Sequence, residues 1–556
     1  MAVDNYYIAD QFSLLSKLMD IHGENSFKTK SYSIAAFTIE KLPKQLTEMS
    51  QQEIFSIKGI GEATGKKIMS ILQTGELSVL KEYMEKTPPG VIEMLNIKGL
   101  GPKKIATVWK QMEIESIGEL LYACNENRLL LYKGFGEKTQ NNVRESIEFY
   151  LQSQGSYLYA EAEILIELIN NRLKENLPER KFEITGEFRR QLEIINLAEW
   201  VTTANAEELK AFLTGTAFTL YNEENNRLTF KGSQNMKLLF HLSTNESFFS
   251  ILFKTSCSDD FLHAWKKETG WNASTESSSE EDIFSSVKIN FIPAYQRETP
   301  DMIEEARKSP LHAIIQPSDI KSIIHSHSNW SDGSNSIEEM TMACIEREYE
   351  YLVISDHSKS AFYANGLTEE RIKQQHQYID ELNRKFSPFK IFKSIECDIL
   401  NDGNLDYSDN ILSTFDLVIA SVHSNLKMTE EKAMMRLLKA IENPHTTILG
   451  HMTGRLLLSR PGYPVNHEKI IDACAANHVA IELNAHPRRL DIDWRWIKHA
   501  LKKNVLISID PDAHSIEGYN DVKYGTIAAQ KAGLTKEKNL SSFSLLKFEA
   551  FLKQKK

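Results

Sequence analysis

Seven short apolar runs recur in residues 320–556, and each is followed by side chains that can bind a metal ion. The runs are Ser322–Ile324, Tyr351–Ile354, Ile391–Ile395, Leu417–Ala420, Thr447–Leu449, Val479–Leu483 and Val505–Ile509. Most are separated by stretches with helical spacing, so the pattern predicts repeated strand-helix units and a barrel-like parallel sheet. Because parallel barrels build their sites at the C-terminal strand ends, the polar side chains after these runs are expected to converge on one face.

Histidines and carboxylates dominate the positions that follow these runs. They are His325, His327, Asp356, His357, Glu396, His423, His451, Asp512 and His514, with Asn484 after one run. A single histidine is usually a hydrogen-bonded surface or core residue, but such repetition is an unlikely accident in a chain with 16 histidines. Converging imidazoles and carboxylates can bind several divalent ions. Since clustered metal ions are typical of enzymes that hydrolyse phosphate esters, the pattern predicts a multi-metal centre of this kind.

The length and composition are those of a large globular protein. The 556 residues predict about three or four domains, and 41% hydrophobic and 25% charged residues are ordinary values. The sequence contains no run of about 18 apolar residues, and residues 1–10 contain no apolar signal core, so we expect a soluble cytoplasmic protein. The five cysteines form no CxxC pair, which argues against a disulfide framework or a thiolate zinc site.

A short repeat occurs three times in residues 1–150. Its copies are Ile57–Gly61, Ile97–Gly101 and Tyr132–Gly136, each containing Lys-Gly-x-Gly. Glycines permit a tight turn whose amide groups point outward at a helix N-terminus, where a phosphate oxygen can bind. The repeat resembles the helix-hairpin-helix motif, which binds the DNA backbone without reading bases. The candidate DNA contacts are Lys58, Gly59, Gly61, Lys98, Gly99, Gly101, Gly134 and Gly136.

The charge of the chain limits the strength of such a contact. The net charge is −11, and residues 1–150 carry 18 Lys/Arg against 19 Asp/Glu. Because basic surfaces dominate non-specific affinity for nucleic acids, we expect DNA contacts to be local and made through backbone amides.

The chain as a whole resembles a known family. Residues 1–41, including Gly23–Lys28, are similar to the N-terminal lyase-type domain of the family X DNA polymerases, and the hairpins match that family's order. Gly186–Arg190 followed by Glu193 is similar to its Gly-Ser-x-Arg-Arg-x-x-Glu nucleotidyltransferase signature. The C-terminal region resembles the polymerase and histidinol phosphatase (PHP) domain of bacterial members. The strings that carry this resemblance are His325–Gly333, Ser355–Ser360, Glu396–Leu400, Ala420–Ser424 and Gly450–Arg455.

The resemblance implies a multidomain protein with three architectures. An all-α helix-hairpin-helix region comes first, followed by an α+β nucleotidyltransferase-like palm and a distorted (β/α)7 PHP barrel. The expected domains are a lyase-like domain with the first hairpin (1–80), a fingers-like hairpin region (81–150), a degenerate palm (151–243), a thumb-like region with an acidic loop (244–308), a linker (309–319) and the PHP barrel (320–556).

The palm lacks carboxylates that the resemblance would require. Nucleotidyl transfer in this family needs two carboxylates one residue apart and a third on a neighbouring strand, which together hold two Mg²⁺ ions. The corresponding positions are Leu197, Glu199 and Leu239. Glu187 replaces the serine of the signature, and Thr255–Ser258 replaces the family's Phe-Thr-Gly-Ser string. We therefore expect polymerase activity to be lost or very weak, unless other carboxylates such as Asp259 and Asp260 substitute.

In the PHP region, the resemblance implies a complete set of nine metal ligands. They are His325, His327, Asp332, His357, Glu396, His423, His451, Asp512 and His514. Glu396 is expected to bridge two cations, because a carboxylate can span two ions and an imidazole cannot. Three ions per chain are expected, held by His325, His327 and Asp512, by Asp332, His357 and His514, and by His423 and His451. Such mixed ligands favour Mn²⁺, Zn²⁺ or Fe²⁺ over Mg²⁺.

Four residues near this centre are expected to act in catalysis. They are Glu396, Asp512, His325 and Arg455. Arg455, Arg460 and Arg488 lie just past ligand-bearing or strand-end segments, where they could hold phosphate oxygens or form surface salt bridges.

Several functions remain open. A metal-dependent 3′–5′ exonuclease in DNA repair is favoured, because an enzyme that acts on a metabolite has no use for three hairpins. The alternatives are a gap-filling repair polymerase, a small-molecule phosphatase of the histidinol-phosphate type, and a non-enzymatic scaffold for DNA ends, which the intact ligand set disfavours. We expect DNA as the partner, through backbone contacts to gapped or 3′-ended substrates, and a monomer that binds no membrane.

Overall fold

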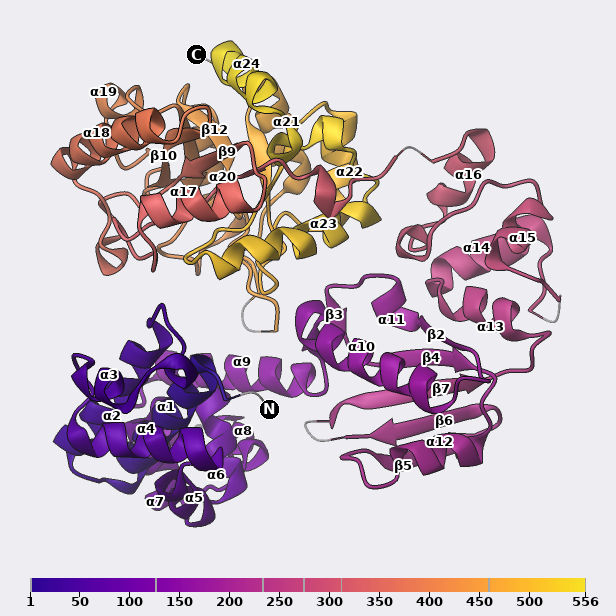
Figure 1. The fold of residues 1–556 in the computed structure, drawn as a ribbon, viewed down its shortest axis with the longest axis horizontal. Helices are drawn as coiled ribbons and strands as arrows, with labels where there is room; N and C mark the ends of the chain where they lie inside the picture. The colour runs from indigo at the N-terminus through magenta and orange to yellow at the C-terminus, as the bar shows by residue number, and fades with distance from the viewer. Residues whose placement is uncertain are drawn as a thin grey trace. The chain divides into compact units, whose positions relative to one another are not determined.

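The computed structural model describes residues 3–125, 128–232, 235–273, 276–311, 313–458 and 461–555. They form two compact units, Met1–Gln154 and Gly155–Lys556, which are described separately (Figure 1). Within the described ranges, no helix is both long and apolar enough to cross a lipid bilayer.

The first unit is helical and has one apolar core. Its α-helices are α1 (Asn5–His22), α2 (Ser26–Glu40), α3 (Gln51–Ser56), α4 (Glu62–Thr74), α5 (Ser78–Glu85), α6 (Pro89–Glu93), α7 (Pro102–Lys110), α8 (Ile117–Asn125) and α9 (Glu137–Ser153). Short 3-10 turns precede α3, α7 and α9: η1 (Leu46–Glu48), η2 (Met94–Asn96) and η3 (Arg128–Leu131). This confirms the expected all-α region at the start of the chain.

Each Lys-Gly-x-Gly copy forms the turn that leads into a helix. The first glycine has a left-handed backbone, with φ of +96° at Gly59, +87° at Gly99 and +96° at Gly134, a conformation that favours glycine. The residue between the glycines is buried in all three copies: Ile60, Leu100 and Phe135. The second glycine is exposed and is the N-cap of α4, α7 or α9. The turns are thus anchored by an apolar side chain while their backbone faces outward.

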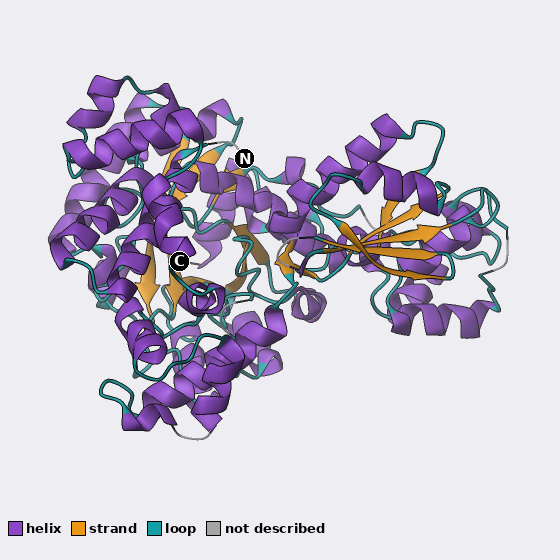
Figure 2. Ribbon diagram, turned by 90° about the horizontal axis from the view of Figure 1, so that it is seen from below, coloured by secondary structure: helices purple, strands orange, loops and turns teal. Residues whose placement is uncertain are grey.

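The second unit begins with a five-stranded sheet, which is seen with its covering helices in Figure 2. Its strands are β2 (Phe182–Thr185), β4 (Ala198–Thr202), β5 (Thr219–Glu224), β6 (Arg227–Lys231) and β7 (Lys237–Leu242), in the order β2-β4-β7-β6-β5. Strands β4 and β7 are parallel, and the other neighbours are antiparallel. The remaining elements of this region are β1 (Tyr157–Leu158), β3 (Ile194–Ile195), α10 (Tyr159–Asn176), α11 (Gly186–Arg189) and α12 (Ala206–Leu213).

Alternate residues of this sheet face different layers, as the pleat of a strand requires. Trp200 and Phe240 belong to a core that also contains apolar residues of α10 and α12. Val201 packs with α13 (Phe248–Thr255) on the opposite face. Glu199 and Leu239 lie two residues from Val201 and His241 along the paired strands β4 and β7, and therefore share this second face.

A smaller helical region follows the sheet. Its elements are α13, α14 (Asp259–Thr269), α15 (Glu280–Ser285), η5 (Ala294–Gln296) and α16 (Asp301–Lys308). Phe253, Trp265 and Phe284 form the centre of its apolar core. The acidic loop expected here includes residues 274 and 275, which lie outside the described residues. Its end is ordered, because Glu280 is buried and pairs with Arg297 at 2.6 Å.

Seven parallel strands in sequence order form the C-terminal barrel. They are β8 (Ser322–Ile323), β9 (Tyr351–Ile354), β10 (Lys390–Asp398), β11 (Leu417–Ser421), β12 (Thr446–Leu449), β13 (Ala480–Asn484) and β14 (Ile507–Asp510). Each strand coincides with one of the seven apolar runs, which confirms the predicted (β/α)7 architecture. The helices of the barrel are α17 (Ile337–Glu346), α18 (Glu369–Lys385), α19 (Asp409–Leu412), α20 (Glu430–Ile441), α21 (His467–Asn477), α22 (Trp494–Lys502), α23 (Val522–Lys531) and α24 (Leu545–Lys555).

The chain segments that follow β8 and β14 meet and nearly close the barrel. Ser326 and Ala513 form a parallel bridge. The amide of His327 donates to the carbonyl of Ala513 at 2.8 Å, and the amide of Ala513 donates to the carbonyl of His325 at 3.3 Å. The seam of the barrel is therefore made by residues within or beside the predicted ligand set.

Candidate metal centre

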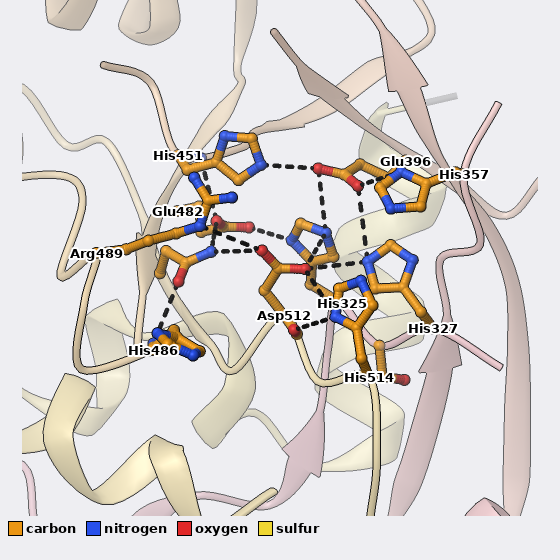
Figure 3. Close-up of polar contacts among 12 residues, drawn as sticks. His325, His327, His357, Glu396, His451, Glu482, His486, Arg489, Asp512 and His514 are labelled. Atoms are coloured by element: carbon orange, nitrogen blue, oxygen red, sulfur yellow. Dashed lines mark hydrogen bonds and ion pairs between the residues drawn. The ribbon is translucent and has the colours of Figure 1, made fainter. Parts of the chain in front are cut away.

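The C-terminal ends of the strands bring the expected ligands together, and Figure 3 shows His325, His327, His357, Glu396, His451, Asp512 and His514 in one cluster. The nine expected ligands are His325 and His327 after β8, Asp332 in the loop before α17, His357 after β9, Glu396 in β10, His423 after β11, His451 after β12, and Asp512 and His514 after β14. This convergence follows from the parallel strands, whose C-terminal ends share one end of the barrel.

Glu396 lies in the middle of the cluster. The distances from its carboxylate oxygens to imidazole nitrogens are 2.9 Å for His451, 3.0 Å for His357, 3.1 Å for His423, 3.3 Å for His325 and 3.6 Å for His327. The side chain is fully buried. This position suits the bridging role that was expected for Glu396.

The ligand atoms form three groups, and within each group they lie within 4.8 Å of one another. The groups are His325, His327, Glu396 and Asp512; His327, Asp332, His357 and His514; and His357, Glu396 and His423. The first two contain the sets expected for two of the ions. The third differs from the expected pair of His423 and His451, because His423 is grouped with His357 and Glu396. His451 contacts the same carboxylate from another side at 2.9 Å.

The carboxylates and imidazoles of the cluster shift one another's pKa values. Burial lowers the pKa of His325, His423 and His514, but neighbouring carboxylates outweigh burial and raise it well above its usual value for His325, to about 10 for His423 and to about 9 for His514. A cation bound by these three rings would displace their protons. Burial raises the pKa of Glu396, but the imidazoles of His423 and His325 outweigh burial and hold this pKa well below its usual value. Burial lowers the pKa of His327 to about 3, and His514 and His357 add to this effect. Glu396 is therefore ionised and His327 neutral, which are the forms that bind metal ions.

Buried polar atoms without hydrogen bonds also fit a metal site. Among the described residues, His325 Nε2, His357 Nδ1 and Glu396 Oε2 are buried and make no hydrogen bond. Buried polar groups normally have partners, because leaving them unpaired costs free energy. A divalent ion at each group would satisfy these atoms.

Two carboxylates that were not singled out in the sequence orient the imidazoles. His325 Nδ1 donates to Glu482 at 2.5 Å, and His423 Nδ1 donates to Asp398 at 2.6 Å. The Nε2 atom of each ring then faces Glu396. Histidines that bind metal ions commonly have such a carboxylate partner. The available signal for Glu482 was an acidic residue inside an otherwise apolar strand.

The backbone and a buried acid position other ligands. His325 and Asp512 have φ of +60° and +51°, in the left-handed region that non-glycine residues rarely adopt. Such conformations concentrate at functional sites. Asp356 accepts from the Ser328 amide at 2.8 Å and the Ser331 hydroxyl at 2.5 Å, and so fixes the loop that carries Asp332.

The arginines expected to bind phosphate are engaged elsewhere or not described. Arg455 donates to the carbonyl of Arg489 at 2.9 Å and to Asp493 at 2.7 Å. It thus supports the loop after β13, which argues against the expected catalytic role. Arg488 pairs with Glu161 at 3.2 Å, and Arg460 lies outside the described residues. Arg489, which was not singled out in the sequence, lies 3.6 Å from Asp512.

The palm positions lie as the resemblance implies, but their side chains differ. Glu199 on β4 is paired in register with Leu239 on β7. The Glu199 carboxylate is paired with His241 at 2.8 Å, and the Cβ of any larger residue at Gly186 would collide with it. Leu197 lies immediately before β4. Of the three positions where the family has carboxylates, only position 199 has one here, and that carboxylate is already paired with an imidazole.

Glu187 and the alternative carboxylates do not restore this site. Glu187 accepts from the amides of Asn196 and Leu197 at 2.5 and 3.3 Å, so it serves the backbone before β4. Asp259 and Asp260 lie on the exposed first turn of α14 and not on the sheet. The structure therefore offers no support for their substitution of the missing residues.

Three parts of the chain match known domain families. Residues 3–77 match the Helix-hairpin-helix domain, residues 91–148 match the SAM-like Helix-hairpin-helix tandem, and residues 324–486 match the PHP domain. The last match ends before Asp512 and His514.

Relatives of the whole chain and of its parts are known. DNA polymerase/3′-5′ exonuclease PolX of Bacillus subtilis (strain 168) is 32% identical over 557 residues, which cover 96% of this chain and 97% of that protein. A protein of Thermoanaerobacter sp. (strain X514) named Probable phosphatase is 28% identical over 185 residues, 32% of this chain and 73% of its own. DNA polymerase lambda of Rattus norvegicus is 28% identical over 117 residues, 21% of this chain and 19% of its own.

Proposed function

Because this chain belongs to the bacterial family X DNA polymerases with helix-hairpin-helix and PHP domains, we propose that it is a 3′–5′ exonuclease whose palm no longer polymerises. Membership of this family means that the chain contains a PHP domain, which is a metal-dependent phosphoesterase domain. The proposed activity rests on the contrast between two sites. The barrel has eight clustered histidines and carboxylates with His451 beside Glu396, and the palm has Glu199 alone at the three expected positions. The Bacillus relative is itself named a 3′-5′ exonuclease.

The chemistry of the barrel depends on how its residues hold a phosphodiester. Divalent ions held by the three ligand groups would neutralise phosphate oxygens and activate water as the nucleophile. Glu482 and Asp398 hold the Nδ1 protons of His325 and His423, so that each Nε2 lone pair faces the centre. Burial shields the Glu396 carboxylate from bulk water and by itself raises its pKa, but the imidazoles of His423 and His325 keep it ionised.

The first unit supplies the affinity for DNA in this proposal. Its three hairpin turns expose amide groups at helix N-termini, which suit phosphate oxygens of any sequence. The expected substrates are 3′-ended strands, including those at gaps, and the expected active form is a monomer. A phosphatase for metabolites is the weaker alternative, because it leaves the hairpins without a use.

The palm is proposed to be inactive in nucleotidyl transfer. Two divalent ions need several carboxylates between them, and Glu199 stands opposite Leu239 and is paired with His241. We expect no incorporation of dNTPs with Mg²⁺ or Mn²⁺.

The test compares substrates with the full chain and Mn²⁺. On 3′-labelled single-stranded DNA we expect immediate release of labelled mononucleotide, on 5′-labelled DNA a ladder of shortened products, and no activity after chelation. Glu396→Ala separates this activity from a contaminating nuclease. Hydrolysis of histidinol phosphate with intact DNA would instead favour the small-molecule phosphatase, and template-directed primer extension would contradict the proposed loss of polymerisation.

A further inference from the structure

The guanidinium of Arg489 lies beside the expected metal ligands, and no hydrogen bond within the described ranges fixes it there. It lies in the loop after β13, and its Nε is 3.6 Å from the Asp512 carboxylate. Among the described residues, its guanidinium makes no hydrogen bond. Figure 3 shows the side chain reaching toward Asp512 on the side of the cluster where Glu482 and His451 lie. Its donors are therefore available to a ligand at the centre.

The neighbouring arginines are fixed by other contacts. Arg455 donates to the loop carbonyls of Arg489 and Leu490 and to Asp493. Arg488 pairs with Glu161 at 3.2 Å, and Arg495 pairs with Glu193 at 3.0 Å. Of these four arginines, only Arg489 has its charge directed at the ligand cluster.

The position of Arg489 has an electrostatic cost. A guanidinium a few ångströms from a centre for divalent cations repels those cations. An anion bound between the guanidinium and the cations would attract both of them and so offset this repulsion. Phosphate oxygens are suitable anions, because the planar guanidinium can donate two parallel hydrogen bonds to them. A phosphate that lies against Asp512 and the nearby histidines is within reach of this side chain.

The barrel fixes the backbone that presents Arg489. The Ala485 amide donates to the Asp510 carbonyl at 2.7 Å, and the Leu457 amide donates to the Arg488 carbonyl at 2.6 Å. Asn484 and Asp491 form a bridge that closes the loop. The direction of the Arg489 side chain is thereby set by the loop backbone.

The palm holds the same segment from outside the barrel. Glu161 of α10 pairs with Arg488, and Glu193, before β3, pairs with Arg495. Glu193 is only 9% exposed, so its ion pair is shielded from solvent more than that of Glu161, which is 44% exposed. The palm therefore contacts the loop after β13 through Arg488, and the start of α22 through Arg495, whose side chain is 54% exposed.

We propose that Arg489 binds the non-bridging oxygens of the phosphate that the barrel hydrolyses, and that Glu193 of the palm is a positioning residue for it. Glu193 acts through Arg495 and the loop, and touches no substrate. The inference rests on the proposed phosphoesterase function and adds to it the side chain that recognises the phosphate. It also gives the palm a use that does not depend on nucleotidyl transfer.

The first experiment removes the guanidinium with Arg489→Ala. We expect kcat/KM for a 3′-ended oligonucleotide to fall about 10- to 100-fold, and the calorimetric affinity for the product dAMP to fall about tenfold, with bound metal unchanged. Guanidinium ions added to the buffer should restore part of the activity of this variant only. The matched control is Arg384→Ala, which removes an exposed arginine from the C-terminal end of α18, at the opposite end of the barrel from the ligands.

The second experiment tests the palm contact with Glu193→Gln. We expect kcat/KM to fall about three- to tenfold in this variant, and no further fall when it is combined with Arg489→Ala, because both changes then remove one interaction. Its control is Glu208→Gln, which weakens the 2.9 Å pair with Arg180 inside the palm and should leave hydrolysis unchanged. Additive losses in the double variant would mean that Glu193 does not act through Arg489.

The outcomes separate this inference from the proposed function. If Arg489→Ala retains activity and dAMP affinity within about twofold while Glu396→Ala abolishes activity, Arg489 does not bind the phosphate and the nuclease proposal stands. If the unaltered protein hydrolyses no DNA with Mn²⁺, the proposed function itself fails.

Discussion

The palm sheet and the barrel both retain their folds, yet the side chains at their expected sites differ. In the palm, β4 and β7 keep the parallel register that places Glu199 opposite Leu239, and Glu199 is paired with His241. In the barrel, five imidazoles lie within 3.6 Å of the Glu396 carboxylate. The backbone of each region could support a metal site, but only the barrel has the ligands.

Under the proposed loss of polymerisation, the palm fold would outlast its chemistry because it has a second structural use. The acidic residues of the palm now face basic residues of the barrel. Besides the pairs that Arg488 and Arg495 make with the palm, Glu163 pairs with Lys523 at 2.7 Å, and the buried Lys531 donates to the Arg190 carbonyl at 2.5 Å. These contacts attach the palm to the barrel independently of Leu197, Glu199 and Leu239.

The largest difference between the regions is expected from their central carboxylates. Glu396→Ala should abolish metal-dependent nuclease activity, by about a thousandfold or more, and lower bound metal by more than one ion per chain. His423→Ala should reduce occupancy at one site only, since Glu396 belongs to two ligand groups and His423 to one. Elemental analysis and 3′-end degradation assays measure both effects. The matched control in the palm is Glu199→Ala, which should change neither nuclease activity nor bound metal. Full nuclease activity in Glu396→Ala would exclude the barrel as the catalytic centre.

Removal of metal should destabilise the barrel and leave the first unit unaffected. An ion present at about 100 times its dissociation constant stabilises the folded state by about 2.7 kcal/mol. For a domain of this size, chelation should lower Tm by about 5 to 10 °C. Scanning calorimetry with and without chelator measures the shift. Glu396→Ala should show a smaller shift, and an equal one would place the stabilising ions outside the cluster.

The hairpin turns should govern DNA affinity without governing the chemistry of the barrel. Gly59→Val and Gly99→Val place a branched residue at φ of +96° and +87°, and together should weaken DNA binding about tenfold or more. Hydrolysis of a small chromogenic phosphodiester should be unchanged. The matched control is Gly75→Val, which strains a helix C-cap with φ of +77° outside the hairpins. Equal losses of DNA binding in the control would mean that the glycines only support the fold.

The junction of the two regions should respond to pH through Lys531. Burial lowers the pKa of Lys531 to about 8, although Glu298 acts in the opposite direction. In an unfolded chain the pKa of lysine is about 10.4. Between about pH 8 and this value the unfolded chain therefore binds more protons than the folded chain, so the free energy of unfolding rises with pH. Lys531→Met should remove a rise on the order of 1 to 3 kcal/mol between about pH 8 and 10. Denaturant titrations across this range, compared between the two proteins, measure it, and an identical pH dependence would contradict the lowered pKa.

The smallest effect is expected from an attempt to restore the palm. Leu197→Asp, Glu199→Asp and Leu239→Asp together should still give no primer extension, because Glu187 and the altered 255–258 segment remain. The measurement is dNTP incorporation with Mg²⁺ and with Mn²⁺. Extension by the triple variant would show that the loss lies in the carboxylates alone.

The barrel could be predicted from the sequence because its signals are local: each strand is an apolar run. Most of the expected ligands lie at or just past the end of such a run, so their convergence needed no long-range contact to be known, whereas Asp332 lies in a loop and came from the family resemblance. The palm positions could also be predicted, since the register of β4 and β7 agrees with the positions counted from the family signature.

Other features depend on contacts between distant segments. Glu482 and His325 are 157 residues apart and meet only after the barrel closes. Arg455 and Arg489 both follow strands, and nothing local distinguishes them. Their roles diverge because Arg455 donates to the carbonyl of Arg489 and so fixes the loop that presents the other side chain.

The seam between the segments after β8 and β14 has a consequence for the order in which the protein is made. His325 and His327 follow β8, the first strand of the barrel, while Asp512 and His514 follow β14, its last strand. On the ribosome, N-terminal domains fold first, so the hairpins can engage DNA before the barrel is complete. The ligand set is filled only when synthesis has passed residue 514. Under the proposed function, a partly synthesised chain would hold DNA before it could hydrolyse it.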